Sequence, residues 1–161
     1  MDVARGLITV LKTAAFALRA ADIPYCLAGG LAVSMLARPR ATEDVDLIVD
    51  VDAKELVRLE QVLRQAFEVV QVSPLRRFDR VSIWRYLVTA EGLPGRLAVL
   101  DLILADRDEY RQAIAHAIDI DLDGTPVAVI DAERLIAVKR LAGRPIDLLD
   151  IESLRDSLDN D

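Results

Sequence analysis

Two aspartates separated by one residue are the side chains in this sequence best suited to hold a cation. Asp44 and Asp46 lie in the run DVDLIV, whose apolar residues predict a β-strand. Side chains two positions apart on a strand project from the same face, so the two carboxylates should lie side by side. Adjacent carboxylates repel each other unless a cation lies between them, and oxygen-only ligands suit Mg²⁺ or Mn²⁺. The spacing therefore predicts a divalent metal site.

A diglycine upstream of the aspartates is suited to binding phosphate. Gly29 and Gly30 follow the buried-strand pattern YCLA and precede a short helical pattern. Glycine lets backbone N–H groups approach a ligand closely, and the N-terminus of a helix carries a partial positive charge. A metal pair beside such a phosphate cradle predicts phosphoryl or nucleotidyl transfer.

Two-metal chemistry needs a third carboxylate, and Asp101 is the best candidate. It lies within the apolar run LAVLDLILA, where an aspartate is costly to bury unless it is paired or binds a metal. The alternative is an aspartate that faces solvent at the end of its strand. We predict that Asp101 is the third metal ligand and the base that helps to activate the acceptor hydroxyl.

The polar residues around these motifs have two interpretations each. Arg40 contacts phosphate or is solvated, and Thr42 binds phosphate or shapes the turn before the aspartate pair. Lys139, one of three lysines against seventeen arginines, holds a triphosphate or lies on a helix surface. Asp147 and Asp150 share one helix face, which is also compatible with plain surface charge.

Hydrophobic periodicity and turn residues predict a mixed α+β chain that forms one domain over residues 1–161, with a core at about 22–130 and a helical C-terminal part at about 131–158. The predicted helices span 3–21, 31–36, 52–67, about 106–117, 131–143 and 145 onward, and the predicted strands span 25–28, 45–51, 68–72, 81–89, 97–104 and a hairpin within 118–130. Asp52 and Glu55 have the spacing of a capping box, and residues 73–79 read as an arginine-bearing loop.

Composition excludes several classes of protein. Aromatic residues make up 4% of the chain, too few for single-stranded nucleic acid bound mainly by base stacking, and the net charge of −7 excludes steering toward nucleic acid by the whole molecule. The basic residues are nevertheless bunched, so the fold could still bring them to one basic mouth. The groups are Arg38 with Arg40, then Arg76, Arg77, Arg80 and Arg85, and finally Lys139, Arg140 and Arg144.

The cellular setting predicted from the sequence is cytoplasmic. Cys26 is the only cysteine, which excludes an internal disulfide and is typical of a reducing compartment. No apolar run approaches the ~20 residues that a membrane span needs, and no signal-peptide pattern is present.

Two segments resemble known motifs of one superfamily. GGLAVSMLARPRATEDVDLIV, with LDLIL around Asp101, resembles the signature of the nucleotidyltransferase superfamily, which has a polymerase-β-like fold. The segment LIAVKRLAGRPIDLLDI is similar to the C-terminal motif of small prokaryotic nucleotidyltransferases of the abortive-infection and toxin–antitoxin type. The resemblance implies an α+β nucleotidyltransferase fold, a mixed β-sheet flanked by helices with further helices at the C-terminus.

The resemblance also implies an activity and a set of site residues. The protein would use a divalent metal to move a nucleoside monophosphate from an NTP to a hydroxyl acceptor such as a tRNA 3′ end, with an antitoxin protein as partner. The arginine-rich segment 76–85 would contact the acceptor's backbone. The implied metal-binding and catalytic residues are Asp44, Asp46 and Asp101, and the implied nucleotide-binding residues are Gly29, Gly30, Arg40, Thr42, Lys139 and Asp147.

Two other functions stay open, because small antibiotic nucleotidyltransferases share the diglycine and the D-x-D spacing, and because one residue departs from the family pattern. Ile146 stands where the family usually has a lysine, so one donor for nucleotide or acceptor is missing. The alternatives are an antibiotic nucleotidyltransferase with an aminoglycoside-like acceptor and a catalytically weak binding protein with the same fold.

Overall fold

The short apolar runs of the sequence form one mixed sheet, and its amphipathic segments form the helices around it. The computed structural model describes residues 3–161. Its helices are α1 (Val3–Ala20), α2 (Gly29–Leu36), α3 (Leu56–Ala66), α4 (Asp108–Ala115), α5 (Ala132–Ala142) and α6 (Pro145–Asp159). Its strands are β1 (Tyr25–Ala28), β2 (Asp44–Val49), β3 (Val69–Val72), β4 (Arg76–Arg77), β5 (Ser82–Thr89), β6 (Leu97–Leu104), β7 (Ile118–Leu122) and β8 (Thr125–Val129). A 3₁₀ turn at Pro94–Arg96 precedes β6.

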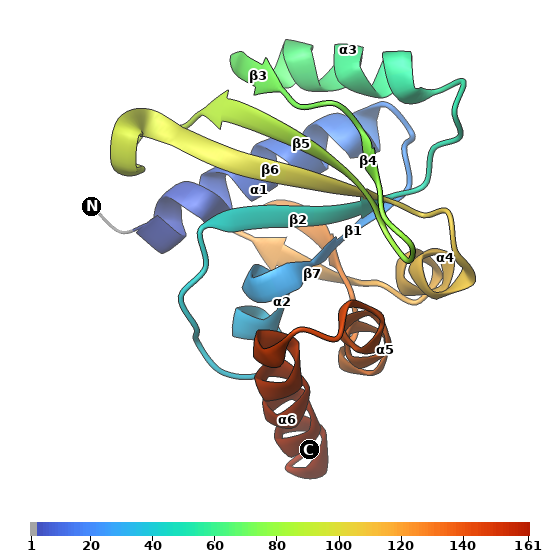
Figure 1. Cartoon of the computed structure of the whole chain (residues 1–161). Helices are drawn as coiled ribbons and strands as arrows, with labels where there is room; N and C mark the ends of the chain where they lie inside the picture. The colour runs from blue at the N-terminus through green and yellow to red at the C-terminus, as the bar shows by residue number, and fades with distance from the viewer. Residues whose placement is uncertain (1–2) are drawn as a thin grey trace.

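The order of the strands brings residues distant in the sequence to the centre of the sheet (Figure 1). The order is β3-β5-β6-β2-β1-β8-β7, with β4 paired to β5. Strand β2 is antiparallel to β1 but parallel to β6, and β5 and β6 form an antiparallel pair. The two acidic strands β2 and β6 are therefore direct neighbours, although about fifty residues separate them in the chain.

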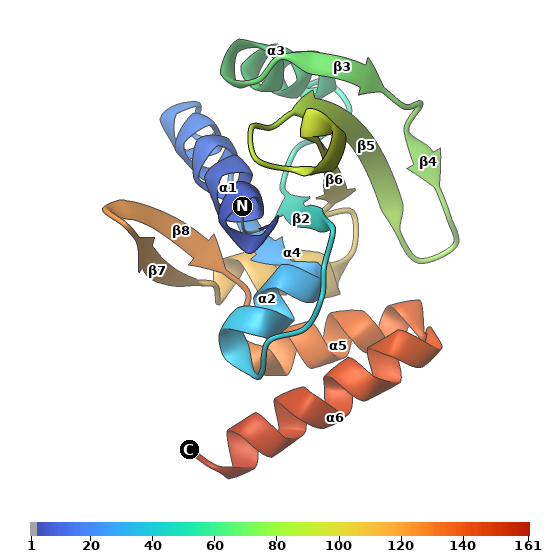
Figure 2. The ribbon, with the colours of Figure 1, turned by 90° about the vertical axis from the view of Figure 1, so that its left-hand side faces the viewer.

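Helix α1 anchors the core, as its periodicity predicts. Leu7, Leu11 and Leu18 recur at helical spacing and are fully buried. The helix packs against β2, β8 and α3, while α5 packs against α4 and α6. In both Figure 1 and Figure 2, α3 and α6 lie at opposite ends of the molecule. Within residues 3–161, no helix combines the length and the apolar character needed to cross a membrane.

The caps of the C-terminal helices are confirmed. The Asp131 carboxylate accepts a hydrogen bond from the backbone N–H of Arg134 at 2.9 Å, so it caps α5. Gly143 ends that helix in the left-handed conformation at φ 65°, and Pro145 then begins α6. These two helices meet at a short connection, which fixes α6 against the α2–β2 side of the molecule.

Two predicted helix starts are wrong. The segment 31–36 is helical, but α2 already begins at Gly29, because the first N–H groups of a helix need no intrahelical partner and tolerate glycine. Helix α3 begins at Leu56 rather than Asp52. The reciprocal bonds of the predicted capping box do form between Asp52 and Glu55, but they close a separate turn before the helix.

The predicted loop 73–79 is also wrong in part. Arg76 and Arg77 form the short strand β4, which pairs with Ile83 and Ser82 of β5. Arg76 and Arg77 are extended because they pair with a long neighbouring strand, and the strand propensity of the two residues does not predict this pairing. Strand β2 ends at Val49, before the predicted end at residue 51.

Candidate active site

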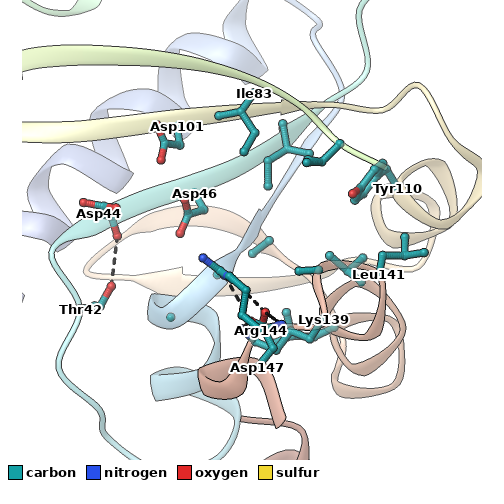
Figure 3. Close-up of a pocket in the computed structure, with 18 of the residues that line it drawn as sticks. Thr42, Asp44, Asp46, Ile83, Asp101, Tyr110, Lys139, Leu141, Arg144 and Asp147 are labelled. Carbon is teal, nitrogen blue, oxygen red and sulfur yellow. Dashed lines mark hydrogen bonds and ion pairs between the residues drawn. The ribbon is translucent and has the colours of Figure 1, made fainter. Parts of the chain in front are cut away.

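The registers of three strands place the acidic residues and the diglycine in one row across the sheet. Asp46 on β2 is paired with Ala28 at the end of β1 and with Asp101 on β6. Asp44 lies two residues before Asp46, on the same face of β2. Figure 3 shows these three carboxylates next to one another, above the cavity that they line.

The cavity has a volume of about 830 Å³, and basic residues from all three bunched groups reach it. They come from the α2–β2 loop, from the β4–β5 region, and from α5 with the connection to α6. The expectation that the fold gathers the bunched basic residues is therefore confirmed, but the cavity is mixed in charge, because Glu43, Asp44, Asp46, Asp101 and Asp147 line it as well. The basic residues that line the cavity are Arg40, Arg80, Arg85, Lys139 and Arg144.

Close neighbours explain why neither residue of the diglycine carries a side chain. Gly29 has φ +68°, and a Cβ atom at this position would lie 2.0 Å from Oδ2 of Asp46. A Cβ atom on Gly30 would lie 3.0 Å from the Arg40 guanidinium and from Oγ1 of Thr42. The N-cap of α2 is Ala28, which has no polar side chain to accept from the first-turn amides. The helix thus presents its N-terminal N–H groups beside Asp46.

The surroundings of the two β2 carboxylates, Asp44 and Asp46, make their ionisation unfavourable. Burial, together with the nearby charges of Asp101 and Asp44, raises the pKa of Asp46 to about 7. Burial and the charge of Asp101 also raise the pKa of Asp44. Among the described residues, the Asp46 side chain has neither an ion-pair nor a hydrogen-bond partner. A cation bound here would relieve this repulsion.

Asp101 differs from the other two acids because a guanidinium already holds it. Arg85 on β5 is paired directly with Asp101 in the antiparallel register. Its Nε donates to Oδ1 of Asp101 at 2.8 Å and its Nη2 donates to Oδ2 at 2.8 Å, while Nη2 lies 4.0 Å from Oδ2 of Asp44. Asp101 is buried, as the prediction of a strand-interior acid requires, and the alternative of a solvent-facing residue is wrong.

The arginine–threonine loop is attached to both α2 and α6. Nε of Arg40 lies 3.1 Å from Oδ1 of Asp150, and the backbone N–H of Arg40 donates to the Ser34 hydroxyl at 3.2 Å. The Thr42 hydroxyl donates to the backbone carbonyl of Asp44 at 3.4 Å, which is the turn-shaping role considered for this residue. Both side chains line the cavity, so a phosphate contact also stays a prediction.

Lys139 lies inside a network of charges and not on a helix surface. It is 4% exposed, and its Nζ lies 2.9 Å from Asp150 Oδ2 and 3.4 Å from Asp147 Oδ1. Asp147 also accepts from Nε of Arg144 at 2.9 Å. Asp147 and Asp150 are buried, so their interpretation as surface charge is wrong. Figure 3 shows Lys139, Arg144 and Asp147 facing the three acids from the other side of the cavity.

The pKa of Asp147 reflects this network. Burial by itself raises the pKa of the carboxyl, but hydrogen bonds from the side chain and backbone of Arg144 and the charge of Lys139 outweigh burial. The net pKa is therefore lowered, and the residue is a carboxylate at neutral pH. Nucleotide binding by Lys139 and Asp147 stays a prediction.

Ile146, which replaces the usual lysine, points away from this network. Its side chain is exposed and does not line the cavity. The sequence reasoning also missed two partners within the site. The sequence places Arg85 among the arginines of the β4–β5 region and gives no sign that it pairs with Asp101. It likewise gives no sign that Asp150 pairs with Arg40. The i, i+3 spacing of Asp147 and Asp150 was the available signal for a shared role.

The carboxylate oxygens of this site are chemically suited to a divalent metal, although they do not converge on one point. Carboxylate oxygens on neighbouring strands suit Mg²⁺ or Mn²⁺, and the half-buried Asp46 carboxylate forms no ion pair with a cation in residues 3–161. Over the same residues, however, no cluster of three His, Cys, Asp or Glu side chains has ligating geometry. Both oxygens of Asp101 are hydrogen-bonded to Arg85, so a metal held by Asp44, Asp46 and Asp101 would compete with this guanidinium.

A glycine-led helix beside acids on neighbouring strands is the arrangement of the nucleotidyltransferase fold, and solved structures agree. An antigenic nucleotidyltransferase-like protein from Paracoccidioides brasiliensis is 25% identical, with a TM-score of 0.64 over 93% of this chain and 75% of that chain. A proposed nucleotidyltransferase from Thermotoga maritima is 16% identical, with a TM-score of 0.61 over 96% and 93% of the two chains. ANT(2")-Ia in complex with adenylyl-2"-tobramycin is 18% identical, with a TM-score of 0.56 over 94% and 88%.

Within this class, a family model defines the protein more closely. The chain belongs to the AbiEii family, described as the nucleotidyl transferase AbiEii toxin of type IV toxin–antitoxin systems, whose model matches residues 12–152. The resemblance inferred from the diglycine, the aspartate pair and the C-terminal motif is thereby confirmed. No curated protein sequence gives a significant match to the chain.

Proposed function

We propose that this protein transfers a nucleoside monophosphate from an NTP to a hydroxyl acceptor, with Asp44, Asp46 and Asp101 as its metal ligands. The observation that carries the proposal is the approach of Gly29 to Asp46, which brings the start of α2 against the acidic row. A triphosphate bound to the helix N-terminus would lie directly beside the carboxylates. Few functions other than phosphate-group transfer need this juxtaposition.

The metal supplies a defined part of this chemistry. Two Mg²⁺ or Mn²⁺ ions, when bound, activate the acceptor hydroxyl and neutralise the charge that develops on the leaving pyrophosphate. Asp101 would act as the base that accepts the proton of the acceptor hydroxyl. Both of its oxygens accept hydrogen bonds from Arg85, which lower the basicity of the carboxylate, so movement of the guanidinium away from Asp101 would favour this step.

The remaining residues would bind and orient the nucleotide. The N–H groups of the diglycine would bind phosphate oxygens, with Arg40 and Thr42 at the adjacent wall of the cavity. The Lys139 ammonium donates one hydrogen bond to Asp147 and forms an ion pair with Asp150, which leaves donor capacity for a phosphate. Asp147 would position Lys139 by holding it against the cavity.

A tRNA 3′ end is the acceptor that we favour. The hairpin of β4 and β5 carries Arg76, Arg77 and the exposed Phe78, and Phe78 also lines the cavity. Arginines there would contact the sugar-phosphate backbone of an RNA whose end enters the site. Membership of the toxin family supports an antitoxin protein as partner, and the lone buried Cys26 supports a reducing cytoplasm as the setting.

A small-molecule acceptor is the second candidate. The structure of ANT(2")-Ia, an antibiotic-modifying neighbour with adenylyl-2"-tobramycin bound, supports it through the shared fold. A cavity of about 830 Å³ would accommodate a nucleotide together with a ligand of modest size. A catalytically weak binding protein is the third candidate, because Ile146 replaces a donor that the family usually has.

Labelled NTPs distinguish these candidates in one assay. The protein is incubated with Mg²⁺, each α-³²P-labelled NTP in turn, and total cellular RNA, and the products are separated on a gel. We expect a labelled band at tRNA size with one preferred base, and Asp46→Asn should give no label. Label in an added aminoglycoside, with none in RNA, would replace the tRNA acceptor by a small molecule. The absence of label in every arm would support the binding protein.

A further inference from the structure

Arg85 holds a special place in the acidic row of the sheet. Its register partner is Asp101, whose own partner on the other side is Asp46, and Asp46 is paired with Ala28 next to the diglycine. A guanidinium therefore lies at one end of a row that begins at the proposed phosphate site. Arg85 lines the same cavity as the three acids.

The contact between Arg85 and Asp101 has the geometry of a strong, specific pair. Two parallel hydrogen bonds of 2.8 Å join Nε and Nη2 to the two carboxylate oxygens. The same Nη2 is 4.0 Å from Oδ2 of Asp44. The guanidinium thus lies between two of the three proposed metal ligands and supplies one positive charge to both.

The two ends of this ion pair differ in exposure. The Asp101 side chain is 8% exposed and cannot turn to solvent, whereas the Arg85 side chain is 54% exposed. When the pair opens, the arginine is therefore the partner that moves. A free guanidinium at the cavity wall would be well suited to a phosphate group, which it binds through two parallel hydrogen bonds.

The surroundings of Asp44 and Asp46 indicate what would separate Arg85 from Asp101. Asp46 has no cationic partner among residues 3–161, and no three ligating side chains of those residues converge. Of the three acids, Asp101 is the one whose two oxygens both accept hydrogen bonds from a cation, Arg85. A divalent cation that binds Asp44 and Asp46 would repel the guanidinium and compete with it for Asp101.

We propose that Arg85 is a positioning residue that competes with the divalent cation for Asp101 and releases this carboxylate when the guanidinium moves to a phosphate of the nucleotide. The inference rests on the proposed function, because it assumes that the acidic row binds a metal. In the free protein, Arg85 keeps the third ligand occupied and the metal affinity low. Completion of the metal site is thereby linked to the arrival of the triphosphate.

The test measures Mn²⁺ binding to the free protein by electron paramagnetic resonance, without nucleotide. Removing the competing guanidinium in Arg85→Gln should tighten Mn²⁺ binding about fivefold or more, because a half-exposed charge-assisted pair no longer has to open. Arg80→Gln is the matched control. Arg80 lines the same cavity, is similarly exposed and pairs with Asp79, so the same loss of charge should leave Mn²⁺ affinity within about twofold.

A double-mutant cycle assigns the effect to Asp101. In an Asp101→Asn background, Arg85→Gln should no longer tighten Mn²⁺ binding, because the competition is already absent. If Arg85→Gln does not fold, Arg85→Lys keeps the charge but loses the two parallel hydrogen bonds, and an intermediate gain in affinity is expected.

The possible outcomes separate this inference from the proposed function. Unchanged or weaker Mn²⁺ binding by Arg85→Gln, or an equal gain in Arg80→Gln, would overturn the role of Arg85 and leave the metal site intact. If Mn²⁺ binds neither the wild type nor Arg85→Gln, with and without a non-hydrolysable NTP, the metal site and the transferase proposal both fail.

Discussion

Three like charges lie close together at the centre of this site, and the protein neutralises them unequally. Asp101 is held by Arg85, Asp44 lies at the edge of that contact, and Asp46 is half-buried without an ion-pair or hydrogen-bond partner among the described residues. Burial and repulsion make the ionised state of Asp46 costly for the folded protein. Residues that serve function often reduce stability in this way.

Replacement of Asp46 should separate activity from stability. Asp46→Asn removes a half-buried charge beside two others, so we expect the free energy of unfolding at pH 8, without metal, to stay constant or to rise by about 1–2 kcal/mol. Transfer of labelled NMP should fall below detection. Urea denaturation and the RNA labelling assay measure the two effects. A fully active variant would exclude the two-metal assignment.

At the scale of elements, the start of α2 is the critical feature. The helix must begin as soon as β1 ends, because this brings its first N–H groups to the acidic row. Only a residue without Cβ allows such close packing of a helix end against the Asp46 carboxylate. The same backbone turn would thus build both the proposed phosphate cradle and the proposed metal site.

A pair of glycine substitutions tests this steric requirement. Gly29→Ala and Gly95→Ala share almost the same positive φ, +68° and +66°, but only the first places a Cβ against Asp46, whereas the second has open space. Both should lose about 1 kcal/mol from backbone strain, and Gly29→Ala should lose about 2 kcal/mol more through the clash. Thermal denaturation compares the two.

Nucleotide binding provides a second measurement for the same pair. Gly29→Ala should bind a non-hydrolysable NTP at least about tenfold more weakly, since displacement of Asp46 disturbs the site, whereas Gly95→Ala should bind normally. Equal stability and equal nucleotide binding of the two variants would argue against close contact between Gly29 and Asp46.

At the scale of the whole molecule, a buried charge network connects the C-terminal helices to the site. Arg40, Asp150, Lys139, Asp147 and Arg144 join the α2–β2 loop, α5 and α6 through contacts of 2.9–3.4 Å. Although the net charge of the chain is −7, positive side chains from distant segments gather at the cavity, where they face the acidic row. The network closes the side of the cavity opposite the sheet.

Lys139 should prove to be as important for stability as for binding. Lys139→Met leaves Asp147 and Asp150 buried without their shared cation, and we expect a loss of about 3 kcal/mol in the free energy of unfolding. Adding Asp150→Asn to this variant should recover part of the loss. Urea denaturation of the single and double variants provides the measurement. A loss below about 0.5 kcal/mol for Lys139→Met would contradict the network.

The pH dependence of stability should identify Asp147 as an ionised member of the network. Because its pKa in the folded protein lies below the ordinary carboxyl value, the carboxylate stabilises the fold above about pH 4, and this contribution disappears as the pH falls through the lowered value. Asp147→Asn should therefore be about 2 kcal/mol less stable than the wild type at pH 7. The difference should shrink below about pH 4 and vanish in stronger acid. A difference that is independent of pH would exclude an ionised Asp147.

Local spacing in the sequence determined the parts of the site that lie within one element. Alternation along a strand places Asp44 and Asp46 on one face, and a diglycine after a buried strand marks the phosphate-binding start of a helix. The caps at Asp131 and Gly143 follow from equally local chemistry. The family resemblance could be found from the same motifs, because their chemistry depends on short-range geometry.

Only the tertiary structure decided which elements meet. Strand order and register place Asp101 against Asp46 and Arg85 against Asp101, and no local pattern specifies that pairing. The i, i+3 spacing of Asp147 and Asp150 defines a helix face, but only the packing of α6 against α5 and the α2–β2 loop buries it around Lys139. The periodicity of a helix or strand determines which of its side chains share a face. The packing of the whole chain determines which other element that face contacts.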